Sequence, residues 1–142
     1  MMRKKLLTLT IGLVIGVLGT APAAYAQQVN NLAASDSLTL TLQQVDSISQ
    51  FLPVMYSNKG CGRCVTAARY FDEKKIPNLK LDLAIQPNGQ VMYQLASRAA
   101  GKPNIAIMYP VVAYKGVVYY GEYPLNEFLE KFSASYQSSA KQ

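Results

Sequence analysis

Cys61 and Cys64 are the only cysteines in the chain, and they lie three residues apart where one apolar pattern gives way to another. The stretch "FLPVMYS" before them is a short apolar run, typical of a buried strand, and "NKG" follows it as a loop. After Cys61 the apolar residues recur at helical spacing. A strand and a helix that meet at a CxxC pair favour an α/β fold, in which the helix covers the sheet.

The helix that begins at Cys61 is predicted to end before Pro77, because proline cannot continue a helix. Its expected apolar stripe consists of Cys64, Val65, Ala68, Tyr70 and Phe71. The next stretch, "NLKLDLAI", alternates leucine with polar residues and predicts a strand. Asn88 is expected to cap a second helix that ends at Gly101. The predicted inner face of that helix comprises Val91, Met92, Leu95, Ala96 and Ala99.

The C-terminal part of the chain predicts a hairpin followed by a helix. "PVVAY" and "VVYYG" flank Lys115 and Gly116, the composition of a tight turn. Leu125, Phe128, Leu129, Phe132 and Tyr136 then fall on one helical face. The predicted order is β-α-β-α-β-β-α, with the first two strands parallel because a helix joins them. We therefore expect an α/β domain with a mixed four-stranded sheet and helices on both faces.

The N-terminal segment is predicted to be a secretory signal. A basic "MMRKK", an apolar "LLTLTIGLVIGVLG" and the small residues of "APAAYA" predict cleavage after Ala26, with an uncleaved membrane anchor as the alternative. Loss of residues 1–26 lowers the number of basic residues from 14 to 11 against 8 acidic residues, so the net charge of the remaining chain is about +3. These basic residues do not cluster into the positive stripe that is typical of a nucleic-acid-binding surface. Residues 27–50 read as an extension with a short helix around 40–50, and residues 51–142 as the domain.

The placement of the cysteine pair predicts its chemistry. Cys61 at a helix N-terminus lies near unpaired backbone N–H groups that stabilise a thiolate, and Arg63 adds a nearby positive charge. The chain has no histidine, which excludes Ser–His and Cys–His mechanisms. A redox dithiol, a small structural disulfide and half of a metal or iron–sulfur site completed by a second chain are the alternatives, and no metal is expected within one chain because CxxC supplies only two ligands.

The CxxC at a strand-to-helix junction, together with a proline that opens the hairpin in "YPVVAYKGVVYYG", resembles the thioredoxin superfamily, and its glutaredoxin branch most closely. The resemblance runs from about Phe51 to Phe132. It implies a thioredoxin-like fold in which Tyr109–Pro110 is a cis peptide that packs against the disulfide. It also implies that Cys61 attacks a substrate disulfide and that Cys64 resolves the mixed disulfide.

The same resemblance suggests substrate-binding positions. The glutathione site of glutaredoxins matches Lys59 approximately, Tyr109 and Pro110 more directly, and Gly121 where the family has two glycines; Arg63 lies inside the motif. We therefore expect an exported, bacterial and periplasmic thiol–disulfide oxidoreductase that needs no cofactor, with glutathione left open as a co-substrate. Its expected partners are cysteine-containing exported proteins and a redox protein that resets the dithiol. The alternative is a non-catalytic thioredoxin-like binding module with a structural disulfide.

Overall fold

The computed structural model describes residues 37–140, so the predicted signal segment, 1–26, and residues 27–36 of the predicted extension lie outside the described part. Its elements are α2 (Leu42–Ile48), β1 (Val54–Ser57), α3 (Gly62–Glu73), β2 (Leu79–Asp82), α4 (Gln86–Ala100), β3 (Val111–Tyr114), β4 (Val117–Tyr119) and α5 (Leu125–Ser139). From β1 onward this is the β-α-β-α-β-β-α order predicted from the sequence, and α2 confirms the short helix expected around 40–50.

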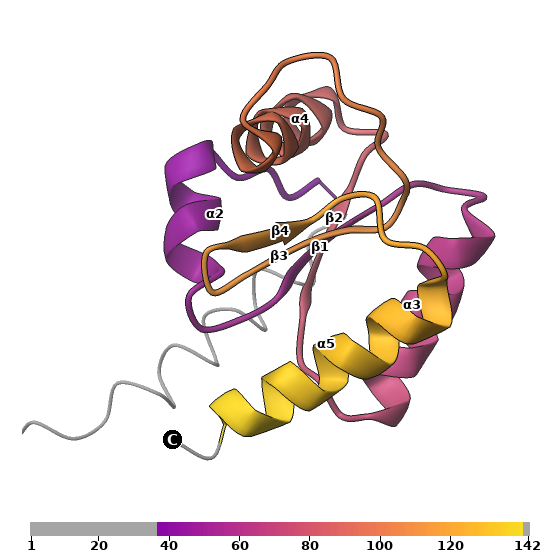
Figure 1. The fold of residues 1–142 in the computed structure, drawn as a ribbon. Coiled ribbons are helices and arrows are strands. Elements are labelled where there is room, and N and C mark those ends of the chain that lie inside the picture. Colours follow the sequence, from indigo (N-terminus) through magenta and orange to yellow (C-terminus); the bar gives the residue numbers. More distant parts are fainter. Residues whose placement is uncertain (1–36, 141–142) are drawn as a thin grey trace, which may run out of the picture.

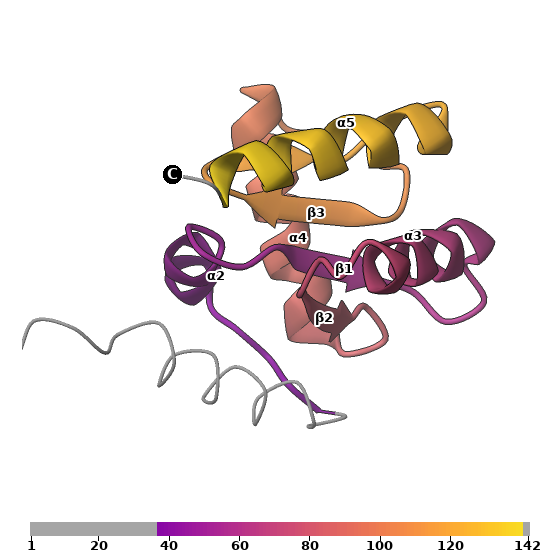
Figure 2. The same ribbon diagram turned by 90° about the horizontal axis from the view of Figure 1, so that it is seen from below.

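The four strands form one mixed sheet in the order β2-β1-β3-β4. β1 pairs in parallel with β2 and antiparallel with β3, and β3 pairs antiparallel with β4. Helices α2 and α4 lie on one face, and α3 and α5 on the other (Figures 1 and 2). The α/β class, the mixed sheet and the helices on both faces are therefore confirmed, and the arrangement is compatible with a thioredoxin-like fold.

Alternating side chains of the central strands supply two cores, one on each face of the sheet. In β1, Val54 and Tyr56 belong to the core under α2 and α4, whereas Met55 belongs to the core under α3 and α5. This division follows from the two-residue period of a strand, which sends neighbouring side chains to opposite faces. The α3–α5 core is largely aromatic, with Phe71 and Phe132 stacked at a centroid distance of 5.1 Å.

The β3–β4 hairpin turns at the two residues predicted from the sequence. Lys115 has a φ of 47° and Gly116 a φ of 77°. Positive φ at both central residues defines the turn whose twist matches that of two antiparallel strands. The Lys115 backbone N–H donates to the Ser49 carbonyl oxygen at 2.7 Å. The turn therefore lies against the end of α2.

Helix α2 belongs to the packed domain, although residues 27–50 were predicted to form an extension. Leu40, Val45 and Ile48 are buried in the core under α2 and α4. Asp46 and Arg98 join α2 to α4 through two hydrogen bonds, one of them 2.9 Å long.

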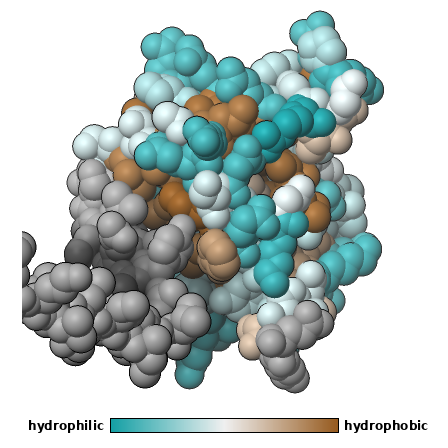
Figure 3. All heavy atoms as spheres, turned by 90° about the vertical axis from the view of Figure 1, so that its left-hand side faces the viewer, coloured by the Kyte–Doolittle hydropathy of each residue, from teal (hydrophilic) through white to brown (hydrophobic). Residues whose placement is uncertain are grey.

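Figure 3 views the side that carries α2 and shows small apolar patches separated by hydrophilic residues. Among the described residues, no helix is both long and apolar enough to cross a membrane.

Three local predictions are wrong. Ala99, expected on the inner face of α4, is exposed, because the buried side of the helix ends with Leu95 and Ala96. Asn88 does not cap α4: the N-cap is Ile85, without a side-chain hydrogen bond, and Asn88 lies buried inside the first turn. Its amide instead donates to the carbonyl oxygens of Leu38 and Asp82. Val65 does not join the buried stripe of α3 and is 66% exposed, because the helix turns its neighbours Cys64 and Ala67 inward.

Candidate functional site

A tight turn after β1 sets the first cysteine at the start of α3. The Cys61 backbone N–H donates to the Asn58 carbonyl oxygen at 3.2 Å, and Gly60 has a φ of 78° inside the turn. Glycine suits this position because it adopts a positive φ without a steric penalty. The chain then enters α3 with Cys61 as the N-cap residue. The loop sequence "NKG" therefore determines where the sulfur is presented.

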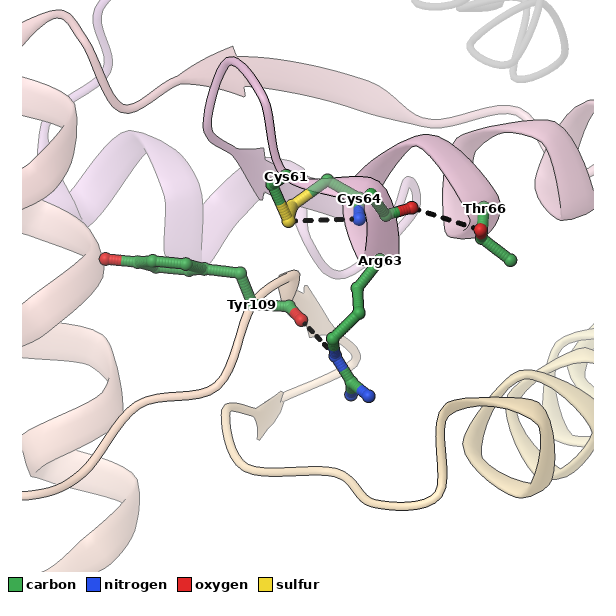
Figure 4. Close-up of a disulfide and its surroundings, with 6 residues drawn as sticks. Cys61, Arg63, Cys64, Thr66 and Tyr109 are labelled. Carbon is green, nitrogen blue, oxygen red and sulfur yellow. Dashed lines mark hydrogen bonds between the residues drawn. A yellow bond between two sulfur atoms is a disulfide. The ribbon is translucent and has the colours of Figure 1, made fainter.

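The sulfur of Cys61 performs the capping role that a serine or aspartate oxygen has in other helices. The Cys64 backbone N–H donates to Cys61 Sγ at 3.1 Å (Figure 4). The first turn of a helix leaves such N–H groups without an intrahelical partner, and their dipoles favour negative charge. The geometry thus supplies a donor to a sulfur that would carry negative charge after reduction.

Cys61 and Cys64 form a disulfide, with their Cα atoms 5.2 Å apart. Cys61 is partly exposed, whereas Cys64 is only 3% exposed. A reagent arriving from solvent therefore meets the Cys61 sulfur first. The two sulfurs already lie at bonding distance across one helical turn, so the pair can open and close without a large backbone movement.

The side chain of Arg63 runs away from the sulfurs and binds two loops. Its Nε donates to the Tyr109 carbonyl oxygen at 2.8 Å (Figure 4). Its Nη2 donates to the Glu122 carbonyl oxygen at 2.6 Å. Within residues 37–140 no carboxylate forms an ion pair with it. Arg63 was predicted to act as a charge beside the thiolate, whereas its observed contacts are to loops 46 and 59 residues away in the sequence, which no local pattern reveals.

The peptide bond between Tyr109 and Pro110 is cis, as the resemblance implied, and Pro110 is buried immediately before β3. A second cis bond joins Tyr123 to Pro124 at the start of α5 and was not predicted. The sequence signal was the same at both positions, a tyrosine followed by proline. Arg63 contacts a carbonyl at or next to each of these bonds.

The remaining predicted positions lie in exposed loops. Lys59 is in the turn that precedes Cys61, and Gly121 is in the loop that joins β4 to α5, beside Glu122. Through the contact of Arg63 with Glu122, the fold brings the Gly121 loop to the start of α3. The roles of Lys59 and Gly121 in binding a substrate stay predictions.

Neither a metal cluster nor a surface hollow offers a competing site among the described residues. The described residues contain no group of three or more His, Cys, Asp or Glu side chains able to hold a metal ion. An open hollow of about 540 Å³ over the start of α4 includes none of the predicted site residues. It is lined by Leu83, Gln86, Gly89, Gln90, Tyr93 and Gln94. The disulfide and its two neighbouring loops therefore remain the candidate site.

Comparison of the chain with protein-family models, with curated proteins and with solved structures gave no match.

Proposed function

We propose that this chain is an exported thiol–disulfide oxidoreductase of the thioredoxin superfamily, similar to glutaredoxins, that exchanges disulfides with cysteine-containing proteins through Cys61 and Cys64. The observation that carries the proposal is the capping of α3 by the Cys61 sulfur, which accepts a hydrogen bond from the Cys64 N–H at 3.1 Å. This donor and the helix dipole favour the thiolate over the thiol and so favour nucleophilic attack at neutral pH. Pro110, buried immediately before β3, occupies the position of the proline on which the resemblance rests.

The proposed reaction transfers two electrons. In the reduced state the Cys61 thiolate attacks one sulfur of a substrate disulfide, forms a mixed disulfide and releases the other substrate sulfur as a thiolate. Cys64 then loses its proton to solvent and attacks Cys61 Sγ. This step closes the Cys61–Cys64 disulfide and releases the second substrate thiolate. The substrate is reduced and the protein is oxidised; a redox partner supplies two electrons to reopen the disulfide, and the reverse sequence oxidises a substrate dithiol.

The exposure of the two cysteines supports different roles for them. Cys61 is partly exposed and caps the helix, whereas Cys64 is 3% exposed and lies one turn into α3. An attacking sulfur must reach a bulky protein disulfide, whereas a resolving sulfur needs only to reach its neighbour. Cys61 is therefore the proposed nucleophile and Cys64 the proposed resolving residue.

Trapping of mixed disulfides tests the proposal. Cys64→Ser removes the resolving sulfur, so Cys61 should retain its partners in cells as high-mass bands that disappear on reduction. Cys61→Ser is the matched control and should trap none, because Cys64 is buried. Trapping by Cys61→Ser alone would reverse the roles. No trapping by either variant, together with a thiol pKa near 8.5 at Cys61, would favour the alternative of a binding module with a structural disulfide.

A redox titration against glutathione would define the direction of exchange. We expect a reduction potential between about −270 mV, typical of strong reductants, and about −120 mV, typical of strong oxidants. The reason is that the helix N-terminus stabilises the thiolate, while the apolar residues of β1 behind it do not solvate charge. A potential below about −300 mV would indicate a structural disulfide instead.

A further inference from the structure

The guanidinium group of Arg63 connects the redox helix to both loops that carry a cis-proline. Its Nε reaches the carbonyl of Tyr109, the residue bonded to Pro110, and its Nη2 reaches the carbonyl of Glu122, one residue before Tyr123–Pro124. The two acceptors lie 13 positions apart in the sequence, on opposite sides of the β3–β4 hairpin. A planar group with several fixed N–H donors can hold two carbonyls at once, whereas a lysine ammonium is a single point of charge.

The two loops also touch each other beside this contact. The Met108 backbone N–H donates to the Tyr120 carbonyl oxygen at 2.9 Å. Met108 precedes one Arg63 acceptor and Tyr123 follows the other, and these two apolar side chains are 41% and 78% exposed. The loops that Arg63 joins to the start of α3 therefore carry two large exposed apolar side chains, and exposed apolar surface that is contiguous is typical of a site that contacts another polypeptide.

We propose that Arg63 is a positioning residue that fixes these two loops against the dithiol, and that the loops thereby present Met108 and Tyr123 to a polypeptide substrate with apolar residues around its cysteines. The inference rests on the proposed function for its substrate part. Arg63 acts here through its two hydrogen bonds and not through its charge at the sulfur. A small disulfide, which needs only to reach Cys61, does not use the loops.

The positional part is tested without any activity measurement. Hydrogen exchange of the Met108 amide should accelerate by about tenfold or more in Arg63→Ala, because the loops lose the contacts that hold them together. Arg63→Lys should show the same acceleration, since one ammonium does not bridge the two carbonyls. Arg69→Ala is the matched control: it removes an exposed arginine of α3 that pairs with Glu73, and exchange at Met108 should not change. An unchanged Met108 rate in Arg63→Ala would overturn the positioning role.

The substrate part is tested by two disulfides that differ in size. With the reduced protein, Arg63→Ala should slow reduction of a disulfide-linked peptide with apolar residues flanking its cysteines by about tenfold, a loss of about 1.4 kcal/mol in transition-state binding. Reduction of hydroxyethyl disulfide should change by less than about fivefold, the size of one exposed charge effect. Equal losses on both disulfides, restored by Arg63→Lys, would show that the charge acts and would overturn the inference.

The two proposals fail in different ways. A chain that reduces neither disulfide, but whose Met108 amide responds to Arg63→Ala, would refute the oxidoreductase function and the substrate part while the positioning of the loops stands. A chain that reduces both disulfides without any effect of Arg63→Ala on Met108 or on the peptide would refute the positioning residue alone.

Discussion

Replacement of Asn88 tests how the N-terminal segment is held to the domain. Asn88 is fully buried in the first turn of α4, and its Nδ2 donates to the Leu38 carbonyl at 2.9 Å and to the Asp82 carbonyl at 3.0 Å. One amide group therefore joins the segment before α2 to the end of β2. Its Oδ1 is buried and has no hydrogen-bond partner among the described residues.

We expect Asn88→Ala to lower the free energy of unfolding by about 1–2 kcal/mol. Two part-buried carbonyls lose their hydrogen-bond donor, at about 1–1.5 kcal/mol each. Removal of the unpaired Oδ1 and the higher helix propensity of alanine offset part of that cost. For a domain of this size the change corresponds to a fall in Tm of about 4–16 °C. Urea denaturation followed by circular dichroism would measure it.

Asn88→Asp separates the hydrogen bonds from side-chain size. At neutral pH the introduced carboxylate only accepts hydrogen bonds and faces two carbonyl oxygens, so the loss should reach about 3–5 kcal/mol, as for an unpaired buried charge. Burial raises the pKa of such a carboxyl, so the loss should shrink as pH falls through that raised value and the acid gains an O–H donor. Gln90→Ala, an exposed site on the same helix, is the control. Equal stability of Asn88→Asp and Asn88→Ala at pH 7 would refute the assigned contacts.

Three further predictions concern the packing of the domain. Phe132→Ala should lower the free energy of unfolding, measured by urea denaturation, by about 3–5 kcal/mol. Phe132 is buried, and its ring centroid lies within 6 Å of the ring centroids of Phe71, Tyr114, Tyr119 and Phe128. A loss as small as that of the exposed Glu130→Ala would contradict this prediction. Tyr56→Phe should leave stability unchanged or raise it by about 1 kcal/mol, because the buried hydroxyl has no partner among the described residues. Burial raises the pKa of Tyr56, so the unfolded chain loses the phenol proton more readily than the folded one, and the free energy of unfolding should fall as the pH rises above about 10. Tyr56→Phe should therefore lose less stability between pH 10 and 12, and identical alkaline unfolding of the two proteins would count against this. A double-mutant cycle at Asp46 and Arg98 should give a coupling free energy of about 0.5–1 kcal/mol that weakens as salt is added. Because its hydrogen bond to Arg98 lowers the pKa of Asp46, the coupling should persist above about pH 4 and vanish as the pH falls through the lowered value. The absence of coupling at pH 7 would refute a stabilising role for this ion pair.

The sequence by itself determined the parts of the fold that depend on local pattern. Alternating leucines predicted β2, the Lys115–Gly116 turn predicted the hairpin, and apolar residues at helical spacing predicted α3, α4 and α5. The position of Cys61 at the start of a helix followed in the same way, because a strand, a short loop and a helical repeat adjoin it in the sequence. The parallel pairing of β1 with β2 followed from the helix between them.

Only the tertiary structure decided what depends on contacts between distant segments. Local pattern marked Asn88 as a cap, but Leu38, 50 residues away, gives it a buried role inside the turn. Arg63 read as a charge beside a thiolate, but its partners are carbonyls of loops brought near by the β3–β4 hairpin. Residues 27–50 read as an extension, but α2 within that range closes one core. In each case the deciding interaction is a hydrogen bond or a buried contact to a residue that no short sequence window contains.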